Sequence, residues 1–452
     1  MLDAAQWLLG AATREVTLFA AVGLLLGGID DLAVDLLWMG RLLWRRVTVH
    51  RRHPRLTAAT LPPPERPGLI AVFVPAWDEA DVIGDMLRAS LARFDHPHYR
   101  IYVGTYPNDP ATAAVVSAVG DSRIRHVGGS LPGPTNKAEC LNRLWDALLD
   151  DERRDGVRAK AVVLHDAEDV VHPCELHVFD RLIERFELVQ LPVLPLIGGR
   201  SRWVSGHYAD EFADGHRRLL VVRAAIGAAI PAAGVGCALS RDALGRMARE
   251  TGGRPFDETS LTEDYEIGVR IGGGGRAAFV AIPAAPGGGL VAVRAYFPDT
   301  FDTAVRQKTR WLVGIALAGW DRLRWQGGLA ERWMRLRDRR VLLAALILAA
   351  SYAALVLMTA CALLGVTVAW PGWSGAILAT NGVLLAWRLA VRGMTVGAVY
   401  GWREGLRAVP RVIVANVIAM AAARRALLAY VPGVVPRWDK TAHAFPVTLP
   451  CD

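Results

Sequence analysis

The longest uncharged segment of this chain constrains its fold more than any other feature. No Asp, Glu, Lys or Arg occurs from Val341 to Trp387. As a helix this segment would measure roughly 70 Å, more than twice the ~30 Å hydrocarbon core of a bilayer. Pro371 and Gly372 lie near its middle and supply a turn. The sequence therefore predicts a transmembrane hairpin at about 341–387.

A second apolar segment lies near the N-terminus. Residues 16–29 are uncharged, and the apolar pattern extends past Arg14-Glu15 on one side and Asp30-Asp31 on the other. The acidic end and the lack of a small-residue cleavage site argue against a cleaved signal peptide. We therefore expect a transmembrane helix followed by a basic flank within residues 1–56.

The flanks of these segments predict their orientation. Arginines are concentrated at 41–55, 322–340 and 388–392. By the positive-inside rule, the region from about 41 to 340 and the C-terminal tail are expected in the cytoplasm, with Pro371 outside. The segment 394–432 allows two interpretations, because only 12 residues separate Arg411 from Arg424. We expect an interfacial or re-entrant helix there, with a short fourth span as the alternative.

The composition supports a membrane protein. Of 452 residues, 52% are hydrophobic and 21% charged, which excludes a disordered chain and argues against an ordinary soluble enzyme. Five scattered cysteines without a C-x-x-C pair argue against a disulfide framework or a zinc ribbon. The excess arginines lie beside apolar segments, so a lipid bilayer is the expected partner and nucleic acid is not.

The region 57–330 alternates strand-like and helical patterns. Apolar runs at 69–74, 100–104, 123–127 and 160–165 are separated by helical patterns. This alternation predicts an α/β domain with a Rossmann-like, mostly parallel sheet and helices on both faces. The region 331–452 would hold the transmembrane hairpin, interfacial helices and the tail. Ligands of such sheets bind beyond the carboxyl ends of the strands.

An acidic cluster follows the strand-like run 160–165. Asp166 and Glu168 stand at i and i+2, a spacing that lets two carboxylates face one hard cation. Mg²⁺ or Mn²⁺ held there would bridge to a diphosphate. The alternative is a solvated loop that caps the next helix, but the position at the end of a buried strand favours the metal site. His165 and His172 are expected to be structural.

Two further motifs lie on helical patterns. Thr262-Glu263-Asp264 is an ordinary helix start, yet a carboxylate at a helix N-terminus also serves as a general base, and the motif alone leaves both open. Gln307, Arg310 and Trp311 share one helix face. The amide and the cation suit a diphosphate and the indole suits a sugar, whereas a basic interfacial helix fits the same residues.

Taken in this order and followed by membrane spans, the three motifs resemble those of the family 2 processive glycosyltransferases, the group of cellulose, chitin and hyaluronan synthases. More narrowly, five stretches resemble the bacterial inner-membrane glycosyltransferases of the phage adsorption protein B group. These are VPAWDEADVI (74–83), GTYPNDPAT (104–112), HDAEDVVHP (165–173), LTEDYEIGVR (261–270) and WDKTAHAFP (438–446). The resemblance covers nearly the whole chain.

The resemblance implies an inverting GT-A transferase of the bacterial inner membrane, with its cytoplasmic catalytic domain at 57–330. It would move a sugar from a nucleotide-diphosphate sugar, UDP-linked, to a growing cell-surface glycan or exopolysaccharide. The implied roles are metal binding by Asp166 and Glu168, nucleotide-sugar binding by Asp78, Glu79, Asp109, Lys137 and Asp166, catalysis by the base Asp264 with Glu263 beside it, and contact with acceptor and diphosphate by Gln307, Arg310 and Trp311.

The chain departs from the group's pattern at two places. Glu168 stands where Asp is usual, and Asn108-Asp109 replaces a pair of Asp residues. Two other classes of function stay open, namely a single-transfer enzyme acting on a lipid or protein and a catalytically idle scaffold or receptor of an export complex. Members of the group can carry a further cytoplasmic regulatory domain. We therefore expect this chain to be a short version or to rely on a regulatory subunit or an outer-envelope export partner.

Overall fold

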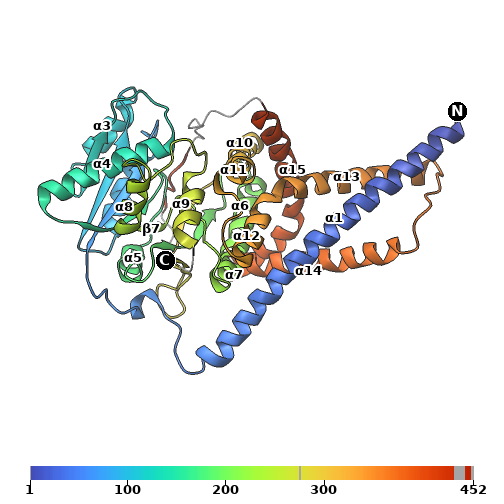
Figure 1. Cartoon of the computed structure of the whole chain (residues 1–452), viewed down its shortest axis with the longest axis horizontal. Coiled ribbons are helices and arrows are strands. Elements are labelled where there is room, and N and C mark those ends of the chain that lie inside the picture. The colour runs from blue at the N-terminus through green and yellow to red at the C-terminus, as the bar shows by residue number, and fades with distance from the viewer. Residues whose placement is uncertain (1, 274–275, 432–442, 449–452) are drawn as a thin grey trace.

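A computed structural model describes residues 2–273, 276–431 and 443–448 of the chain. A mixed α/β region lies at one end of the molecule, and long apolar helices extend from the other (Figure 1). The sheet of the α/β region has seven strands in the order β3-β2-β1-β4-β7-β5-β8. Its strands are β1 (Leu69–Pro75), β2 (Tyr99–Thr105), β3 (Ile124–Gly128), β4 (Ala159–Leu164), β5 (Leu188–Gln190), β7 (Cys237–Ser240) and β8 (Ala277–Phe279).

The sheet is mostly parallel, as the sequence predicts. Only β7 among these strands runs antiparallel to its neighbours, β4 and β5. This reversed strand is a feature that the alternating pattern does not indicate. A second, two-stranded parallel sheet pairs β6 (Val193–Leu196) with β9 (Val293–Tyr296) and borders the end of the main sheet.

Helices cover both faces of the main sheet. Alternate side chains of β1 divide between two cores, with Val72 in one and Phe73 in the other. This period of two places apolar residues on both sides of the strand, which is typical of a parallel sheet buried on both faces. The first core is completed by α2 (Ile83–Arg93), α3 (Pro110–Ala118) and α5 (Glu175–Leu182), and the second by α4 (Lys137–Asp155), α8 (Arg241–Glu250) and α9 (Glu263–Gly272).

Two helix starts follow from local capping. Asn136 accepts a hydrogen bond from the amide of Glu139 at 2.8 Å and begins α4, and Asp109 accepts one from the amide of Thr112 at 3.3 Å and begins α3. Helix α2 begins only at Ile83, because residues 79–82 form a turn in which the amide of Val82 donates a hydrogen bond to the carbonyl oxygen of Glu79. These caps place both helix N-termini at the carboxyl edge of the sheet.

Four helices among the described residues are long and apolar enough to cross a membrane, judged by length and composition. They are Ala4–Val49, Val341–Leu363, Ser374–Tyr400 and Trp402–Tyr430. The first comprises α1 (Leu2–Trp44) and a π-helical segment (Arg45–Val49), and the others are α13, α14 and α15. Helices α1, α13 and α14 extend away from the sheet, whereas α15 lies across the end of this group (Figure 1).

Glycines allow the apolar helices to pack closely. A methyl group on Gly23 of α1 would lie 2.7 Å from Ile347 of α13, and one on Gly28 would lie 2.9 Å from Leu384 of α14. Gly405 of α15 approaches α14 even more closely, since its added methyl would lie 2.5 Å from the carbonyl oxygen of Gly393. Small residues at such crossings let backbones approach without a side chain between them.

A set of short helices joins the sheet to the apolar helices. They are α6 (Arg202–Asp214), α7 (Leu220–Ala225), α10 (Phe301–Trp311), α11 (Gly319–Leu323) and α12 (Leu329–Arg339). At this junction α1 continues past Asp30-Asp31, because Asp31 pairs with Arg337 at 2.7 Å and Asp30 pairs with Arg340 at 2.7 Å. Asp30 and Asp31, at the acidic end of the predicted first span, therefore contact arginines at the end of α12 and the start of α13.

Three carboxylates at this junction are buried and paired with arginines. We call Asp35, Asp210 and Asp214 the junction carboxylates. Asp210 and Asp214 stand one turn apart on α6, and they meet Arg392 at 3.0 Å and Arg388 at 2.8 Å, which stand one turn apart on α14. This contact explains why α14 remains helical beyond Trp387, where the uncharged segment ends. The further partners are Arg411 of α15 for Asp210 at 2.7 Å, and Arg218 for Asp35 at 2.7 Å and for Asp214 at 2.9 Å.

Candidate active site

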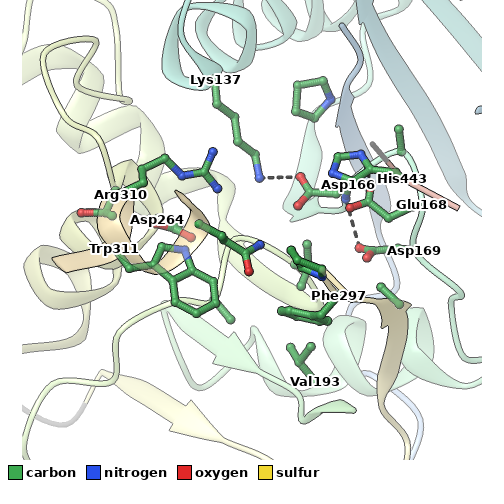
Figure 2. A pocket seen from close by; sticks show the side chains of 18 of the residues that line it. Lys137, Asp166, Glu168, Asp169, Val193, Asp264, Phe297, Arg310, Trp311 and His443 are labelled. Carbon is green, nitrogen blue, oxygen red and sulfur yellow. Dashed lines mark hydrogen bonds and ion pairs between the residues drawn. The ribbon is translucent and has the colours of Figure 1, made fainter. Parts of the chain in front are cut away.

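A pocket opens beyond the carboxyl ends of β1 and β4, where the fold class places ligands. Most of the residues singled out in the sequence line it, although they come from distant parts of the chain (Figure 2). Those residues are Glu79, Lys137, Asp166, Glu168, Glu263, Asp264, Gln307, Arg310 and Trp311. Asp78 and Asp109 are not among the lining residues.

Asp78 and Asp109 form a turn beside the pocket. The backbone amide of Asp78 donates a hydrogen bond of 2.6 Å to Asp109, which also begins α3. Asp78 has a positive φ of 55°, a conformation that Asp tolerates better than most residues. The neighbouring Asn108 bonds both backbone groups of Gly133, at 2.7 and 2.8 Å, and so fixes the loop before α4. The Asn at this position thus has a structural role that the sequence does not reveal.

The loop after β4 is fixed by a buried histidine. His165 contacts Asp169 at 2.8 Å and Glu175 at 2.7 Å, and Asp169 accepts a hydrogen bond of 3.0 Å from the amide of Asp166. Burial alone would lower the pKa of His165, but the carboxylates of Glu175 and Asp169 raise it to about 10. The imidazolium therefore compensates two buried acids and holds the loop that carries Asp166 and Glu168. This geometry agrees with the structural role expected for His165.

Lys137 lies between the two acidic motifs. Its ammonium group pairs with Asp166 (Figure 2). Although burial opposes the charge, Asp166, Glu263 and Asp264 raise the pKa of Lys137 above its usual range. The lysine thus stays cationic at the N-terminus of α4, where the helix dipole adds further positive potential. This combination is suited to a phosphate group.

A donor set for a divalent cation forms around Glu168. Its ligand atoms and those of Glu79 and His443 all lie within 4.8 Å of one another. His443 Nδ1 lies 2.8 Å from Glu79 and 3.3 Å from Glu168. Burial raises the pKa of Glu168 to about 8, and the neighbouring acids oppose its ionisation further while His443 favours it. Two carboxylates with one imidazole fit a hard divalent cation, which would compensate this excess negative charge.

Sequence reasoning missed His443. It lies in the stretch 438–446 that carries the resemblance, but the histidine is far from every acidic motif in the chain, and no local pattern marks it as a ligand. Asp166 was grouped with Glu168, yet its carboxylate faces Lys137, and the donor set around Glu168 contains Glu79 instead. The two carboxylates of the predicted pair therefore point to different partners.

The start of α9 does not behave as an ordinary helix cap. Thr262 makes no side-chain capping hydrogen bond, and its hydroxyl oxygen is buried without a partner among the described residues. The segment after α10 packs directly on it, since a methyl group on Gly314 would lie 2.5 Å from Thr262. Packing rather than capping thus fixes this motif against the extension of α10.

Asp264 lies in a confined, acidic environment. A methyl group on Gly234 would come 2.5 Å from its carboxylate, and Gly234 has a positive φ of 74°, so only glycine is suited to this position. Burial raises the pKa of Asp264 above its usual range, while the charge of Lys137 opposes this effect. Burial and the nearby Asp264 raise the pKa of Glu263 to about 7. A carboxylate with a raised pKa is suited to accept a proton near neutral pH.

Helix α10 supplies the opposite wall of the pocket. Gln307, Arg310 and Trp311 all line it, whereas Lys308 points elsewhere and pairs with Glu211 of α6 at 2.6 Å. Trp311 packs edge-on against Tyr208, with ring centroids 6.1 Å apart. An apolar wall of aromatic rings thus continues from the charged part of the pocket, and Phe212 and Phe297 complete it.

Comparison with known families identifies the group to which this chain belongs. The family model described as "Glycosyltransferase like family 2" matches residues 67–314, which is more than half of the chain. The chain belongs to this family. The match begins just before β1 and ends shortly after α10, so it contains every predicted site residue. His443, which the sequence did not single out, lies outside it.

Two curated relatives match this family 2 member over nearly its whole length. Bacteriophage adsorption protein B of Escherichia coli strain K12 is 36% identical over 98% of this chain and 63% of the relative. Bacteriophage N4 adsorption protein B of Escherichia coli O157:H7 shows the same identity and coverage. The chain thus spans 63% of the length of the curated relatives it matches. The resemblance to this group that the sequence indicates is confirmed.

Solved structures with partial similarity include two transferases. Mannosyltransferase PcManGT from Pyrobaculum calidifontis, in complex with GDP-Man and Mn²⁺, is 18% identical with a TM-score of 0.49 over 89% of this chain and 99% of that chain. Glucosyl-3-phosphoglycerate synthase from Mycobacterium tuberculosis, in complex with Mn²⁺, UDP-glucose and phosphoglyceric acid, is 20% identical with a TM-score of 0.34 over 59% of this chain and 86% of that chain. The family assignment does not depend on these alignments.

Proposed function

We propose that this chain is a membrane-bound inverting glycosyltransferase that moves a sugar from a nucleotide-diphosphate sugar to a growing glycan. The observation that carries the proposal is the convergence of Lys137, Asp264 and Arg310 on one pocket beside an acidic donor set (Figure 2). The resemblance to the processive synthases supports a UDP-linked donor and a cell-surface polysaccharide as product. Family membership supports glycosyl transfer as the reaction class.

The residues divide the chemistry according to their charge. Lys137 and Arg310 stabilise the negative charge that develops on the leaving diphosphate. Asp264, which lies near both cations, accepts the proton of the acceptor hydroxyl as that oxygen attacks the anomeric carbon, so the configuration inverts. Glu263 lies beside this base, and the charge of Asp264, together with burial, raises the pKa of Glu263. Trp311 offers a flat apolar face on which an acceptor sugar stacks.

We also propose that Glu168 and His443, with Glu79 or Asp166, hold Mg²⁺ or Mn²⁺. Bound there, the cation would neutralise the diphosphate of the donor sugar. The support is the donor set itself, in which a buried Glu168 oxygen lies 3.3 Å from His443 Nδ1 and accepts no hydrogen bond among the described residues. Asp78 and Asp109, which shape the neighbouring turn, remain the proposed nucleoside contacts.

The tail supports a topology for the membrane part. His443 lies beside Glu79 and Glu168, so the tail is on the same side as the α/β domain. The chain between them must therefore cross the membrane an even number of times. We propose that α13 and α14 make these two crossings and that α15 lies along the cytoplasmic surface of the inner membrane. On α15, Trp402, Leu406 and Ile413 share one exposed apolar face, which suits such a position.

Cysteine labelling tests this topology. A cysteine at Pro371, in the turn between α13 and α14, should react with an impermeant reagent added to intact cells. A cysteine at Val447, which is fully exposed in the described tail, should react only after the membrane is permeabilised. Labelling of residue 447 in intact cells would contradict the proposed position of α15.

Nucleotide release tests the proposed reaction. The full chain in lipid nanodiscs would be incubated with UDP-glucose, UDP-N-acetylglucosamine and GDP-mannose, with Mn²⁺, with Mg²⁺ or with a chelator. We expect release from at least one UDP-sugar, loss of that release in the chelator, and recovery when the cation is restored. Release that persists in excess chelator would remove the metal, and no release from any donor would favour the idle scaffold.

A further inference from the structure

One short segment carries most of the net charge of the chain. Between Asp35 and Glu65 the sequence contains six arginines and no Asp or Glu. The formal net charge of the whole chain is +8, so this segment contributes +6 and the other residues together +2. We call these six residues the juxtamembrane arginines, and they are Arg41, Arg45, Arg46, Arg51, Arg52 and Arg55.

Within the described ranges, no acidic side chain forms an ion pair with any of the juxtamembrane arginines. Five of them, all except Arg41, are exposed. The basic flank before α13 differs, because Arg337 and Arg340 are paired with Asp30 and Asp31. Of these two basic flanks, the one that follows α1 is therefore available to an external anion.

Exposed apolar side chains lie among these arginines. Leu43, Trp44 and Val47 are 64%, 58% and 44% exposed, and their spacing places them on one side of the helix. A helix that combines exposed Leu and Trp with several Arg is typical of the boundary between headgroups and acyl chains. An aqueous surface gives these apolar groups no partner, whereas a bilayer surface accommodates both kinds of side chain.

The segment continues directly from a membrane helix. Helix α1 packs against α13 and α14, runs without interruption to Trp44 and continues as a π-helix to Val49. In Figure 1 it crosses the other apolar helices obliquely and ends beyond them. A second copy of the chain is an unsuitable partner for this surface, since two identical segments of charge +6 repel each other.

We propose that the juxtamembrane arginines, together with Leu43, Trp44 and Val47, bind the headgroups of anionic phospholipids on the side of the membrane that holds the α/β domain. The attraction acts within a Debye length of the bilayer, ~8 Å at physiological ionic strength. Because the chain enters the α/β domain soon afterwards, at Leu69, this contact ties the domain to the lipid surface independently of the nucleotide-sugar site.

The preference of the protein for an anionic over a zwitterionic phospholipid measures this interaction. The full chain would be reconstituted in phosphatidylcholine bilayers that contain a trace of spin-labelled phosphatidylglycerol or spin-labelled phosphatidylcholine. The fraction of each label that the protein immobilises gives a relative association constant. We expect phosphatidylglycerol to be preferred several-fold, and we expect the preference to fall toward one in about 1 M salt, where the Debye length is ~3 Å.

Two quadruple variants distinguish lipid binding by the juxtamembrane arginines from an effect of the net charge of the protein. The first replaces Arg45, Arg46, Arg51 and Arg52 with Gln and should remove most of the preference. The matched control replaces four exposed arginines of the α/β domain, namely Arg88, Arg153, Arg158 and Arg249. Because the control changes the net charge by the same amount but keeps the juxtamembrane arginines, it should retain the preference.

Three outcomes would overturn the proposal. They are equal immobilisation of the two lipids, a preference that the first variant retains, and a preference that both variants lose equally. Added inorganic phosphate at constant ionic strength should leave the preference unchanged, since competition would indicate a site for free phosphate instead. Circular dichroism of both variants verifies that each is folded, so a loss of preference in the first alone reports on lipid binding.

Discussion

Two regions of this protein that hold buried carboxylates differ in how the charge of those carboxylates is compensated. At the junction, Asp214 meets Arg388 at 2.8 Å and Arg218 at 2.9 Å. Burial would raise the pKa of Asp214, but these two arginines hold it well below its usual range. In the pocket, six carboxylates face only Lys137, Arg310 and His443 among the described lining residues.

This difference in charge compensation indicates different roles for the junction and the pocket. With its pKa held low by two arginines, Asp214 keeps its charge at every physiological pH and holds α6 against α14, because removing that charge leaves buried cations without their partner. An acidic cluster with few cations raises the pKa of its own members, as for Glu168, Glu263 and Asp264. Such a cluster has an excess of negative charge that a bound cation or a proton compensates.

The largest effect is expected on catalysis at Asp264. Asp264→Asn removes the proton acceptor and retains the shape of the side chain, so turnover should fall about 10²- to 10⁴-fold. Binding of the donor sugar should change little, because the amide still fits the space beside Gly234. Nucleotide release and donor binding would be measured side by side. The control Glu258→Gln alters a carboxylate that does not line the pocket, and turnover of the Asp264 variant at the control level would exclude the proposed base.

A comparable change at the junction should affect stability instead. Asp214→Asn leaves Arg388 facing a neutral side chain and Arg218 with Asp35 as its acidic partner, and breaking a buried ion pair in this way costs about 3–5 kcal/mol. The exposed pair Asp242–Arg158 provides the control, because Asp242→Asn should cost less than about 1 kcal/mol. Denaturant midpoints of the two variants in detergent measure the difference. Equal midpoints would contradict the structural role of the junction carboxylates.

Alanine substitutions at two glycines with similar φ angles distinguish the effect of backbone strain from the effect of displacing the proposed base, Asp264. Gly234 and Gly252 have φ of 74° and 71°, but only Gly234 lies against Asp264, and nothing within 4 Å surrounds the added methyl at Gly252. Gly252→Ala should cost only backbone strain, roughly 1 kcal/mol. Gly234→Ala should also lower turnover, about tenfold to hundredfold, because it shifts the carboxylate. Similar turnover in both variants would show that Asp264 tolerates the shift.

The smallest expected effect is a gain in the free energy of unfolding when Glu263, in the pocket, is replaced. Glu263 has a pKa of about 7 in the folded chain against 4.5 for a free side chain. The native state therefore keeps a proton that the unfolded chain releases, so the free energy of unfolding falls as pH rises from 4.5 to 7. Glu263→Gln lacks this loss and should be more stable than the parent at pH 8, on the order of 1 kcal/mol, and similar to it at pH 4.5. Melting temperatures at the two pH values test this sign.

The sequence predicts the elements that repeat a local pattern. Strands β1 to β4 fall on the four apolar runs that the sequence singles out, and two long apolar helices, α13 and α14, occupy the segment predicted as a hairpin, because alternation and apolar length are local properties. The reversed strand β7 and the length of α14 do not follow, since both depend on contacts with distant residues. The pairing of Arg388 with Asp214 joins positions that no motif connects.

The pocket shows the same limit. Glu263, Asp264 and Arg310 are recognisable because each lies in a short motif with a familiar spacing. His443 is not recognisable, because its neighbours in space, Glu79 and Glu168, follow β1 and β4, whereas its neighbours in sequence form no pattern typical of a ligand. The different orientations of Asp166 and Glu168 depend on Lys137 and His443, and spacing within the acidic cluster cannot reveal them.

The position of His443 also sets an order of events during synthesis of the chain. Glu79 and Glu168 leave the ribosome early, but the third member of their cluster follows α13, α14 and α15 in the sequence. The cluster therefore cannot assemble until all the apolar helices have been made. A nascent chain that stalls before α13, α14 and α15 are made therefore lacks this histidine, and its acidic cluster contains only Glu79 and Glu168.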